Sequence, residues 1–364
     1  MIQTMSLKIA IIGCGKIADA HVEEIRKIPS AQLVAVCDLE PIMAEQLSVR
    51  YAVPRWYSNF TRMLDEQKPD VVHITTPPHS HLALVRQAVA AGCHIFLEKP
   101  VAPHYEDVRN LLAAVGAADR KLTVNYWPNF EDPALKLRRL VDSGTIGDVV
   151  HLESFYGYDL AGEYGMALRR DAHHWVHRLP GKLFQNVLDH VLNKIALYLP
   201  DDNPSIHTVA YRGDSRHQEH EGSRLLDELR VIIQGEHATA YATFSAHARP
   251  IGHSLRVLGT LNTANVDFMM RTVTLDRKQN FPSALGRLLP PFLVAKDYFR
   301  QGLGNVNRFS HARFHYFHGM RRLLTEFYDC IENNSAPPIA NQEILRVSAM
   351  MEAIFQQVYP EVLA

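Results

Sequence analysis

The stretch that decides the fold is LKIAIIGCGKIA, residues 7–18. Its first six residues are a continuous apolar run of the kind that forms a buried strand. The pattern G-x-G-x-x-A follows at once, and apolar residues then recur at helical spacing until Pro29. A glycine pattern between a strand and a helix is the context that dinucleotide binding requires. We therefore predict that the chain opens with the strand, turn and helix of a dinucleotide-binding domain.

Each residue of this turn has a predicted task. Gly13 permits the tight turn, Gly15 lets the backbone approach a pyrophosphate, and Ala18 lets helix and strand pack closely. Lys16 and Ile17 open the helix, whose N-terminus favours negative charge. We expect all five residues to border the cofactor.

Asp38 ends the next predicted strand, residues 32–37. An acid at this place accepts hydrogen bonds from the ribose hydroxyls and repels a 2′-phosphate. No arginine follows within the next several residues, so the pattern favours NAD over NADP. The alternative is that Asp38 is only a turn residue.

The β-α alternation continues to Tyr126, with predicted strands over 70–75, 93–97 and 122–126. Repeated β-α units indicate an α/β fold with a doubly wound parallel (Rossmann) sheet over residues 1–127. The strand over 93–97 runs into Glu98, Lys99 and Pro100. Ligands bind beyond the carboxyl ends of such strands, so Lys99 is a candidate for chemistry. The alternative is a solvated lysine beside a salt-bridged glutamate.

Composition sets limits on the rest. The 364 residues suffice for two domains, and the net charge of −1 does not indicate nucleic acid as a partner. The four cysteines occur singly, which is typical of small core residues in a reducing compartment. No signal pattern and no apolar run of about 20 residues occur, so we expect a cytoplasmic protein.

From Val149 onward the pattern changes to alternating strands, and the predicted strands include residues 225–233 and 265–275. One-sided alternation predicts a C-terminal α+β domain, residues 128–364, with an open, mainly antiparallel sheet. A helix over 184–198 carries an apolar stripe, and Asn186, Asp189, His190 and Asn193 share its other face. On periodicity alone that face would be solvated.

GCGKIA, the strand end VAVCD, ITTPPHSH and HIFLEKP occur in this order and spacing, and together they resemble the Gfo/Idh/MocA oxidoreductases. The resemblance implies that Lys99 is the general acid/base beside the nicotinamide, with Glu98 also bordering the cofactor. It implies that a cis peptide bond precedes Pro100. It further implies contacts to the nicotinamide ribose, from Thr75, Pro77 and His81. In the second domain it implies a sheet face that makes an oligomer contact, giving a homodimer or homotetramer.

The family carries a D-x-G-x-H-type motif on the helix over 184–198. Aligned on His190, this chain has Asn186 in place of the aspartate and Leu188 in place of the glycine. His190 can still relay a proton or bind the reacting hydroxyl. Asn186 can donate and accept hydrogen bonds but cannot act as a carboxylate base. The family arginine near the domain junction is also absent, with Asn129-Phe130 in that region.

Two further segments are candidates for binding. The first, residues 171–177, is rich in histidine, and we expect substrate contacts there from His174 and Trp175. A surface loop is the first alternative and a zinc site the second, although the spacing matches no standard zinc signature. The second is an insertion over about 278–319 whose bases outnumber its acids. From Phe281 to Gly319 the bases are Arg287, Lys296, Arg300, Arg308 and Arg313, against the single acid Asp297. It either covers the sheet or meets phosphate, of a nucleotide-linked sugar or of a membrane surface.

The combined prediction is an NAD-dependent dehydrogenase or reductase. It would act on a secondary hydroxyl of a sugar, a sugar derivative or a cyclic polyol, nucleotide-linked sugars included. Lys99 and His190 are the predicted catalytic residues, with Asn186 and Tyr126 as hydrogen-bonding partners of the substrate. Two alternatives remain: an enzyme that cleaves glycosidic bonds through transient NAD oxidation, and a non-catalytic NAD-binding regulatory protein.

Overall fold

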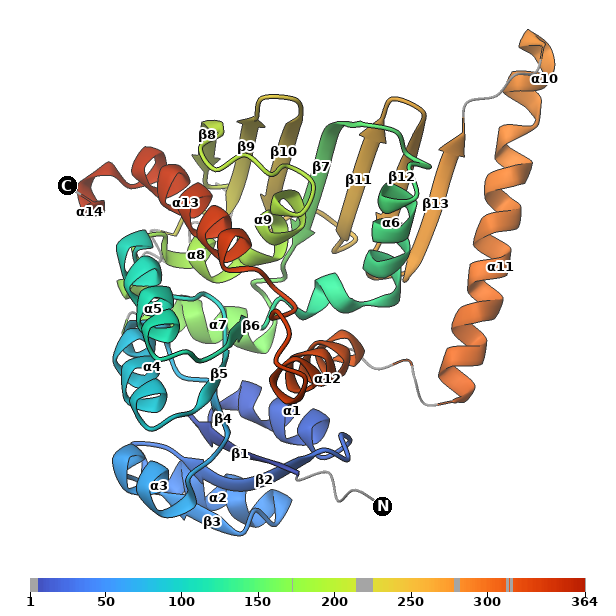
Figure 1. Cartoon of the computed structure of the whole chain (residues 1–364). Coiled ribbons are helices and arrows are strands. Elements are labelled where there is room, and N and C mark those ends of the chain that lie inside the picture. Colours follow the sequence, from blue (N-terminus) through green and yellow to red (C-terminus); the bar gives the residue numbers. More distant parts are fainter. Residues whose placement is uncertain are drawn as a thin grey trace. The chain divides into compact units, whose positions relative to one another are not determined.

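The computed structural model divides the chain into two compact units (Figure 1). The first unit comprises Met1–Trp127 and Gly319–Ser348, and the second comprises Pro128–His318 and Ala349–Ala364. The structure describes residues 6–171, 173–213, 225–277, 282–311, 314 and 317–363. Each unit contains one sheet.

The sheet of the first unit has six parallel strands in the order β3-β2-β1-β4-β5-β6. Its strands are β1 (Leu7–Ile12), β2 (Ala31–Cys37), β3 (Arg55–Tyr57), β4 (Val71–Ile74), β5 (His94–Leu97) and β6 (Leu122–Val124). The helices along this part of the chain are α1 (Lys16–Ile25), α2 (Pro41–Tyr51), α3 (Phe60–Gln67), α4 (His81–Ala90) and α5 (Tyr105–Ala117), with the 3-10 turns η1 (Pro78–Ser80) and η2 (Trp127–Phe130). The strand order reverses between β1 and β4, the place where such sheets bind ligands.

This architecture confirms the predicted doubly wound parallel sheet. Strand β3 was not predicted, because it has three residues and lies at the edge of the sheet. Its Trp56 side chain is 41% exposed, so the strand carries no apolar pattern that sequence reading could detect.

Helix α12 (His318–Glu332) returns to the first unit from the far end of the chain. Its buried side chains follow helical spacing and include Leu324, Phe327 and Tyr328. Tyr328 reaches His73 of β4, and Arg321 pairs with the buried Glu24 of α1 at 2.7 Å. These contacts build a part of the first unit from residues that are distant in sequence.

The second unit has a seven-stranded sheet in the order β13-β12-β11-β7-β10-β9-β8. Its strands are β7 (Val149–Gly157), β8 (Ser205–Tyr211), β9 (Glu228–Gln234), β10 (Thr239–Ser245), β11 (His253–Gly259), β12 (Asn262–Asp267) and β13 (Thr272–Arg277). The helices that follow η2 are α6 (Asp132–Asp142), α7 (Glu163–Arg170), α8 (Lys182–Val187), α9 (Asp189–Ala196), α10 (Ser283–Leu288) and α11 (Pro290–Ser310), with η3 (Trp175–Arg178); α13 (Asn341–Val358) and α14 (Pro360–Leu363) close the chain. All strand pairs of this sheet are antiparallel except β7 with β10, which is parallel. The sheet is therefore mixed but mainly antiparallel, as predicted.

One predicted strand was wrong. The sequence suggested a single strand over 265–275, whereas the structure has β12 and β13 joined by a turn. Asp267 makes that turn, because its side chain accepts a hydrogen bond from the backbone of Met270 at 2.8 Å. An aspartate that bonds to the backbone a few residues further on favours a turn over a continued strand.

One face of this sheet is covered and the other is open. Helices α6 and α9 lie on the covered face (Figure 1). In β9, Leu229, Val231 and Ile233 are buried while Ile232 is 50% exposed. The one-sided alternation predicted for this strand is therefore confirmed.

Among the described residues, no helix is both long enough and apolar enough to cross a membrane.

Candidate functional site

The glycine turn has the geometry that its sequence predicts. Gly13 has a φ of +98°, and a Cβ there would lie 2.8 Å from backbone atoms of Thr75 and Thr76. Only glycine fits both the conformation and the space. At Gly15, by contrast, a Cβ would meet no heavy atom within 4 Å, so this side of the turn is open. Ala18 is fully buried between α1 and the sheet.

Asp38 stands directly after β2 and is held by the glycine turn. Its Oδ2 accepts a hydrogen bond from the backbone N–H of Cys14 at 2.6 Å. Its Oδ1 accepts one from the backbone of Glu40 at 2.9 Å. Each carboxylate oxygen can accept a further bond, so the acid is oriented and still able to bind hydroxyl groups. At the start of α1, Lys16 is exposed and Ile17 is half-buried.

The segment that follows β4, residues 75–81, contacts the glycine turn. Thr75 is buried, and its hydroxyl lies within hydrogen-bonding distance of two carbonyl oxygens, those of Ile12 and Gly13 (3.0 and 2.6 Å). Pro77 is half-buried and precedes η1. His81 is fully buried, with its ring between the carbonyl oxygens of Thr76 and Val101 at 2.8 and 2.9 Å. His81 thus ties two loops together, and a direct contact to ribose remains a prediction.

Lys99 follows β5 at the same edge of the sheet, and the Lys99–Pro100 bond is cis, as the resemblance implied. Glu98 below it is buried. Its Oε2 accepts the backbone N–H of Lys99 at 3.1 Å. Its Oε1 accepts hydrogen bonds from Asn125 at 2.6 Å and from His21 Nε2 at 2.9 Å. Glu98 therefore anchors the backbone that leads to Lys99.

The contact to His21 continues into a buried chain that sequence analysis missed. Nδ1 of His21 lies 2.8 Å from Nδ1 of His73, and Nε2 of His73 lies 2.8 Å from the Tyr328 hydroxyl. With neutral rings, Tyr328 donates to His73, His73 donates to His21, and His21 donates to Glu98. We call these four residues the buried chain.

Two members of the buried chain, His73 and Glu98, have shifted pKa values. Burial lowers the pKa of His73 well below its usual value, and His21 adds to this effect. Burial alone would raise the pKa of Glu98, but the hydrogen bonds from His21 and Asn125 hold it below its usual value. The buried chain therefore contains an ionised Glu98 and a neutral His73. His73 within an apolar strand was the signal in the sequence that could have revealed it.

Tyr126 belongs to the first unit and is 1% exposed. Its backbone N–H donates to Val124 at 2.7 Å. Its role as a substrate contact remains a prediction.

In the second unit, the predicted helix over 184–198 is two helices, α8 and α9, joined at Leu188. The predicted polar face is only partly accessible, because Asp189 and Asn193 are each 1% exposed. The half-buried positions are Asn186 and His190, one turn apart. The alternative that periodicity alone favoured, one solvated face of four polar residues, is wrong because Asp189 and Asn193 are buried.

The His190 ring lies 4.8 Å from the ring of Tyr156 in β7, centroid to centroid. Its backbone carbonyl accepts a hydrogen bond from Lys194, which is 1% exposed. Burial lowers the Lys194 pKa to about 7, while Glu131 acts in the opposite direction. Burial also raises the Glu131 pKa to about 7. The sequence patterns did not predict this pair, although a lysine one turn after His190 on an apolar helix was a usable signal.

The histidine-rich segment is divided among separate contacts. His173 is exposed, and His177 Nε2 lies 2.8 Å from the carbonyl oxygen of Leu168. His174 Nδ1 accepts from the backbone of Val176 at 3.4 Å, and its ring stacks 5.7 Å from that of Trp175. In the described part of the chain, no group of three His, Cys, Asp or Glu side chains could hold a metal ion.

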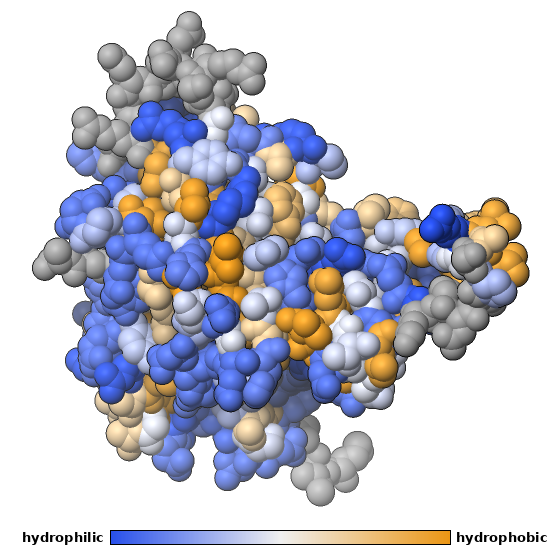
Figure 2. Space-filling model, turned by 90° about the horizontal axis from the view of Figure 1, so that it is seen from above, coloured by the Kyte–Doolittle hydropathy of each residue, from blue (hydrophilic) through white to orange (hydrophobic). Residues whose placement is uncertain are grey.

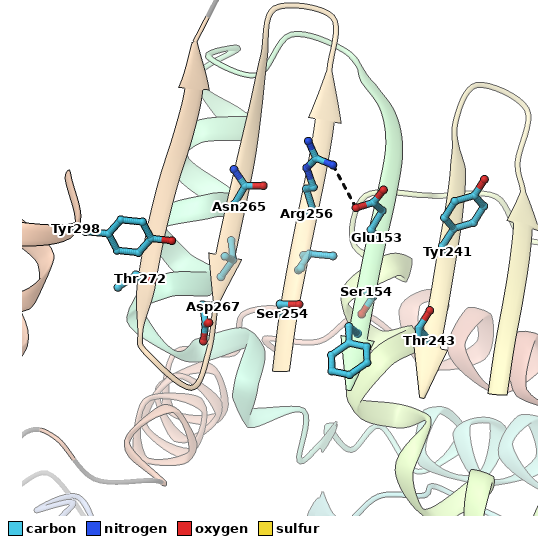
Figure 3. A pocket seen from close by; sticks show the side chains of 13 residues that line it. Glu153, Ser154, Tyr241, Thr243, Ser254, Arg256, Asn265, Asp267, Thr272 and Tyr298 are labelled. Atoms are coloured by element: carbon cyan, nitrogen blue, oxygen red, sulfur yellow. Dashed lines mark hydrogen bonds and ion pairs between the residues drawn. The ribbon is translucent and has the colours of Figure 1, made fainter. Parts of the chain in front are cut away.

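A groove of about 460 Å³ lies on the sheet of the second unit (Figure 3). Arg256 and Glu153 form an ion pair there at 3.5 Å, and Tyr298 of α11 borders it. Its lining residues, among those the structure describes, include none of the predicted site residues.

The residues of the first unit fit a dinucleotide. The open side of Gly15 leaves room for a ligand against the backbone, and the N-terminus of α1 follows directly. The oriented carboxylate of Asp38 stands at the end of the neighbouring strand. Lys99 belongs to the same sheet edge, whereas His190 belongs to the second unit.

Comparisons with known proteins agree with this geometry. Residues 7–126 match a family described as "Oxidoreductase family, NAD-binding Rossmann fold" (GFO_IDH_MocA). The chain is 31% identical to the D-glucoside 3-dehydrogenase of Escherichia coli over 144 residues, which are 39% of this chain and 41% of that protein. It is 31% identical to the inositol 2-dehydrogenase of Rhizobium meliloti over 149 residues, which are 40% of this chain and 43% of that protein. The chain thus spans less than half the length of these relatives.

A solved structure covers the whole fold. The WlbA dehydrogenase from Bordetella pertussis, in complex with NADH and UDP-GlcNAcA, matches with a TM-score of 0.75 and 18% identity. The match covers 99% of this chain and 97% of that one. It confirms the predicted combination of a Rossmann sheet and a C-terminal α+β unit.

Proposed function

Because residues 7–126 form an NAD-binding Rossmann domain of the Gfo/Idh/MocA oxidoreductases, we propose that the whole chain is an NAD-dependent dehydrogenase or reductase. Its substrate would be a secondary alcohol, or the matching ketone, of a sugar, a sugar derivative or a cyclic polyol. The relatives named for a glucoside and for inositol support this substrate class. The observation that carries the proposal is Lys99, a lysine anchored by a buried carboxylate at the ligand-binding edge of the sheet.

In the proposed reaction, bound NAD supplies the hydride acceptor. The Lys99 amine takes the hydroxyl proton during oxidation and returns it during reduction. The His190 ring binds the same oxygen, and Lys194 positions the backbone of His190. Asn186 donates or accepts a hydrogen bond with a neighbouring hydroxyl, since an amide can do both.

We propose NAD rather than NADP as the cofactor. Both oxygens of Asp38 are directed by backbone N–H groups, so the carboxylate cannot easily turn away from a 2′-phosphate. Glu40 follows two residues later and adds a second negative charge near the turn. Like charges in such proximity disfavour the phosphate.

The test is to mix the protein with NAD and a panel of myo-inositol, glucosides and UDP-linked sugar acids, and to follow NADH by its absorbance. We expect NADH with at least one substrate, and a loss of about 10²- to 10⁴-fold in kcat for Lys99→Ala. Lys8→Ala is the matched control, because Lys8 is exposed at the opposite end of the same sheet. Equal kcat values for the two variants would remove Lys99 from the mechanism.

The same experiment separates the alternatives. A protein that releases cleaved glycoside without net NADH, while retaining tightly bound cofactor, would be a redox-assisted lyase. A protein that binds NAD but turns over none of the panel would support the regulatory alternative. Asn186→Asp restores the family's carboxylate, so a gain in kcat for this variant would show that the departure limits the wild type.

A further inference from the structure

Helix α11 presents its apolar side chains to solvent. The helix has 21 residues, none of them buried. Phe292, Phe299, Leu303 and Val306 are spaced by 7, 4 and 3 positions, so they form one stripe along the helix. Their exposed fractions are 67%, 69%, 57% and 65%. We call these four residues the apolar stripe.

The polar side of α11 faces the protein, which is the reverse of an ordinary surface helix. Gln301 accepts a hydrogen bond from the backbone of Val273 in β13 at 2.6 Å. Asn305 donates to the carbonyl of Met270 at 2.9 Å, and Arg308 pairs with Asp132 at 3.0 Å. These polar contacts fix the rotation of α11 beside β13 (Figure 1). The apolar stripe, on the other side of the helix, therefore faces the solvent.

The outward face also carries positive charge. Lys296 and Arg300 are exposed and flank the apolar stripe, and Arg287 is exposed on the preceding α10. Asp297 is the one acid in the sequences of α10 and α11, and it is half-buried on the side of the contacts to β13. Figure 2 shows hydrophobic colour gathered at the arm formed by α10 and α11, beside hydrophilic residues. Arg313 of the predicted basic set lies outside the described residues.

We propose that α11 is a membrane-surface helix that docks this protein on anionic lipid. A helix with Phe and Leu on one side and Lys and Arg beside them lies in the interface plane, with its apolar side chains below the headgroups. The cations would then lie at the level of the lipid phosphates. The helix is too polar to span the bilayer, which agrees with docking on its surface.

A second copy of the chain fits the apolar stripe less well. Four side chains of this size and exposure have roughly 400–500 Å² of accessible surface to bury. A stable protein interface buries about 800 Å² of accessible surface on each partner. An isologous helix pair would also bring Lys296 and Arg300 of both copies together without an acid on that face. A lipid surface needs no such area and supplies the negative charge.

The test is co-sedimentation of the full-length protein with vesicles of equal parts phosphatidylcholine and phosphatidylglycerol, and with vesicles of phosphatidylcholine alone. We expect binding to the anionic vesicles that weakens with added salt. Phe299→Ser with Leu303→Ser should weaken binding by at least about tenfold. Lys296→Glu with Arg300→Glu should weaken it by at least about thirtyfold.

Matched controls change the same chemistry elsewhere. Val49→Ser removes a 76% exposed apolar side chain from α2, and Arg62→Glu with Arg109→Glu makes the same change in net charge in the first unit. These variants should bind vesicles like the wild type. The proposal would be overturned if the Phe299→Ser/Leu303→Ser variant bound anionic vesicles as tightly as the wild type, or if the wild type bound no vesicles. If the wild type bound no vesicles and formed a dimer that the Phe299→Ser/Leu303→Ser variant did not form, the apolar stripe would be assigned to a second copy of the chain instead.

Discussion

Replacing Glu98 by glutamine tests whether the buried chain holds the site together. The carboxylate accepts three hydrogen bonds, two on Oε1 and one on Oε2. Glutamine has a single acceptor oxygen. If that oxygen takes the place of Oε1, the amide N–H₂ meets the backbone N–H of Lys99, and two buried donors face each other.

The cost follows from these contacts. A hydrogen bond to a charged group contributes about 1.5–3 kcal/mol, and an unsatisfied buried donor costs about 1–3 kcal/mol. We therefore expect Glu98→Gln to lower the free energy of unfolding by about 2–4 kcal/mol. The backbone of Lys99 loses its anchor at the same time, so kcat should fall as well.

Urea unfolding followed by circular dichroism measures the effect, with Glu106→Gln as the control. Glu106 is exposed and pairs with Arg109 on the surface, so its replacement should change the free energy of unfolding by less than about 0.5 kcal/mol. Because the folded-state pKa of Glu98 is lowered, its contribution is complete above the unfolded pKa of 4.5 and decreases as the pH falls below it. The difference between wild type and Glu98→Gln should shrink there. Equal stability of the two glutamine variants at pH 7 would refute the reasoning.

Three further predictions concern the first unit. Gly13→Ala places a Cβ 2.8 Å from backbone atoms at a φ of +98°, so NAD affinity should drop by more than about tenfold. Calorimetric titration measures this drop, with Ala20→Gly in the following helix α1 as the control. Asp38→Ser removes the carboxylate, so the preference for NAD over NADP in kcat/KM should fall by at least about tenfold, and an unchanged ratio would exclude Asp38 from cofactor selection. The buried, neutral His73 has a lowered folded-state pKa, so the unfolded chain binds a proton there first as the pH falls. The contribution of His73 to the free energy of unfolding is therefore complete above pH 6.5 and should fall by about 1.4 kcal/mol for each pH unit below it. Urea unfolding from about pH 7.5 to 5.5 measures this fall, and a free energy that does not change over this range would contradict the neutral assignment.

The local signals in the sequence identified the parts of the site that a few neighbouring residues specify. The turn at Gly13, the acid at the end of β2 and the lysine after β5 each depend on a strand, a turn residue and a helix that follow one another in the chain. Periodicity and turn chemistry act over such short distances, so these elements could be read before the structure was known.

The missed features of the site and of α11 depend on contacts between elements that are distant in the sequence. Tyr328 reaches His73 across 255 positions of sequence. The apolar strand around His73 indicates a buried polar side chain, but it does not indicate which residue is its partner. The burial of Lys194, and the inward rotation of the polar side of α11, likewise depend on which surface each helix meets. Helical periodicity states which residues share a face, but only the packing of the folded chain decides whether that face meets the core or the solvent.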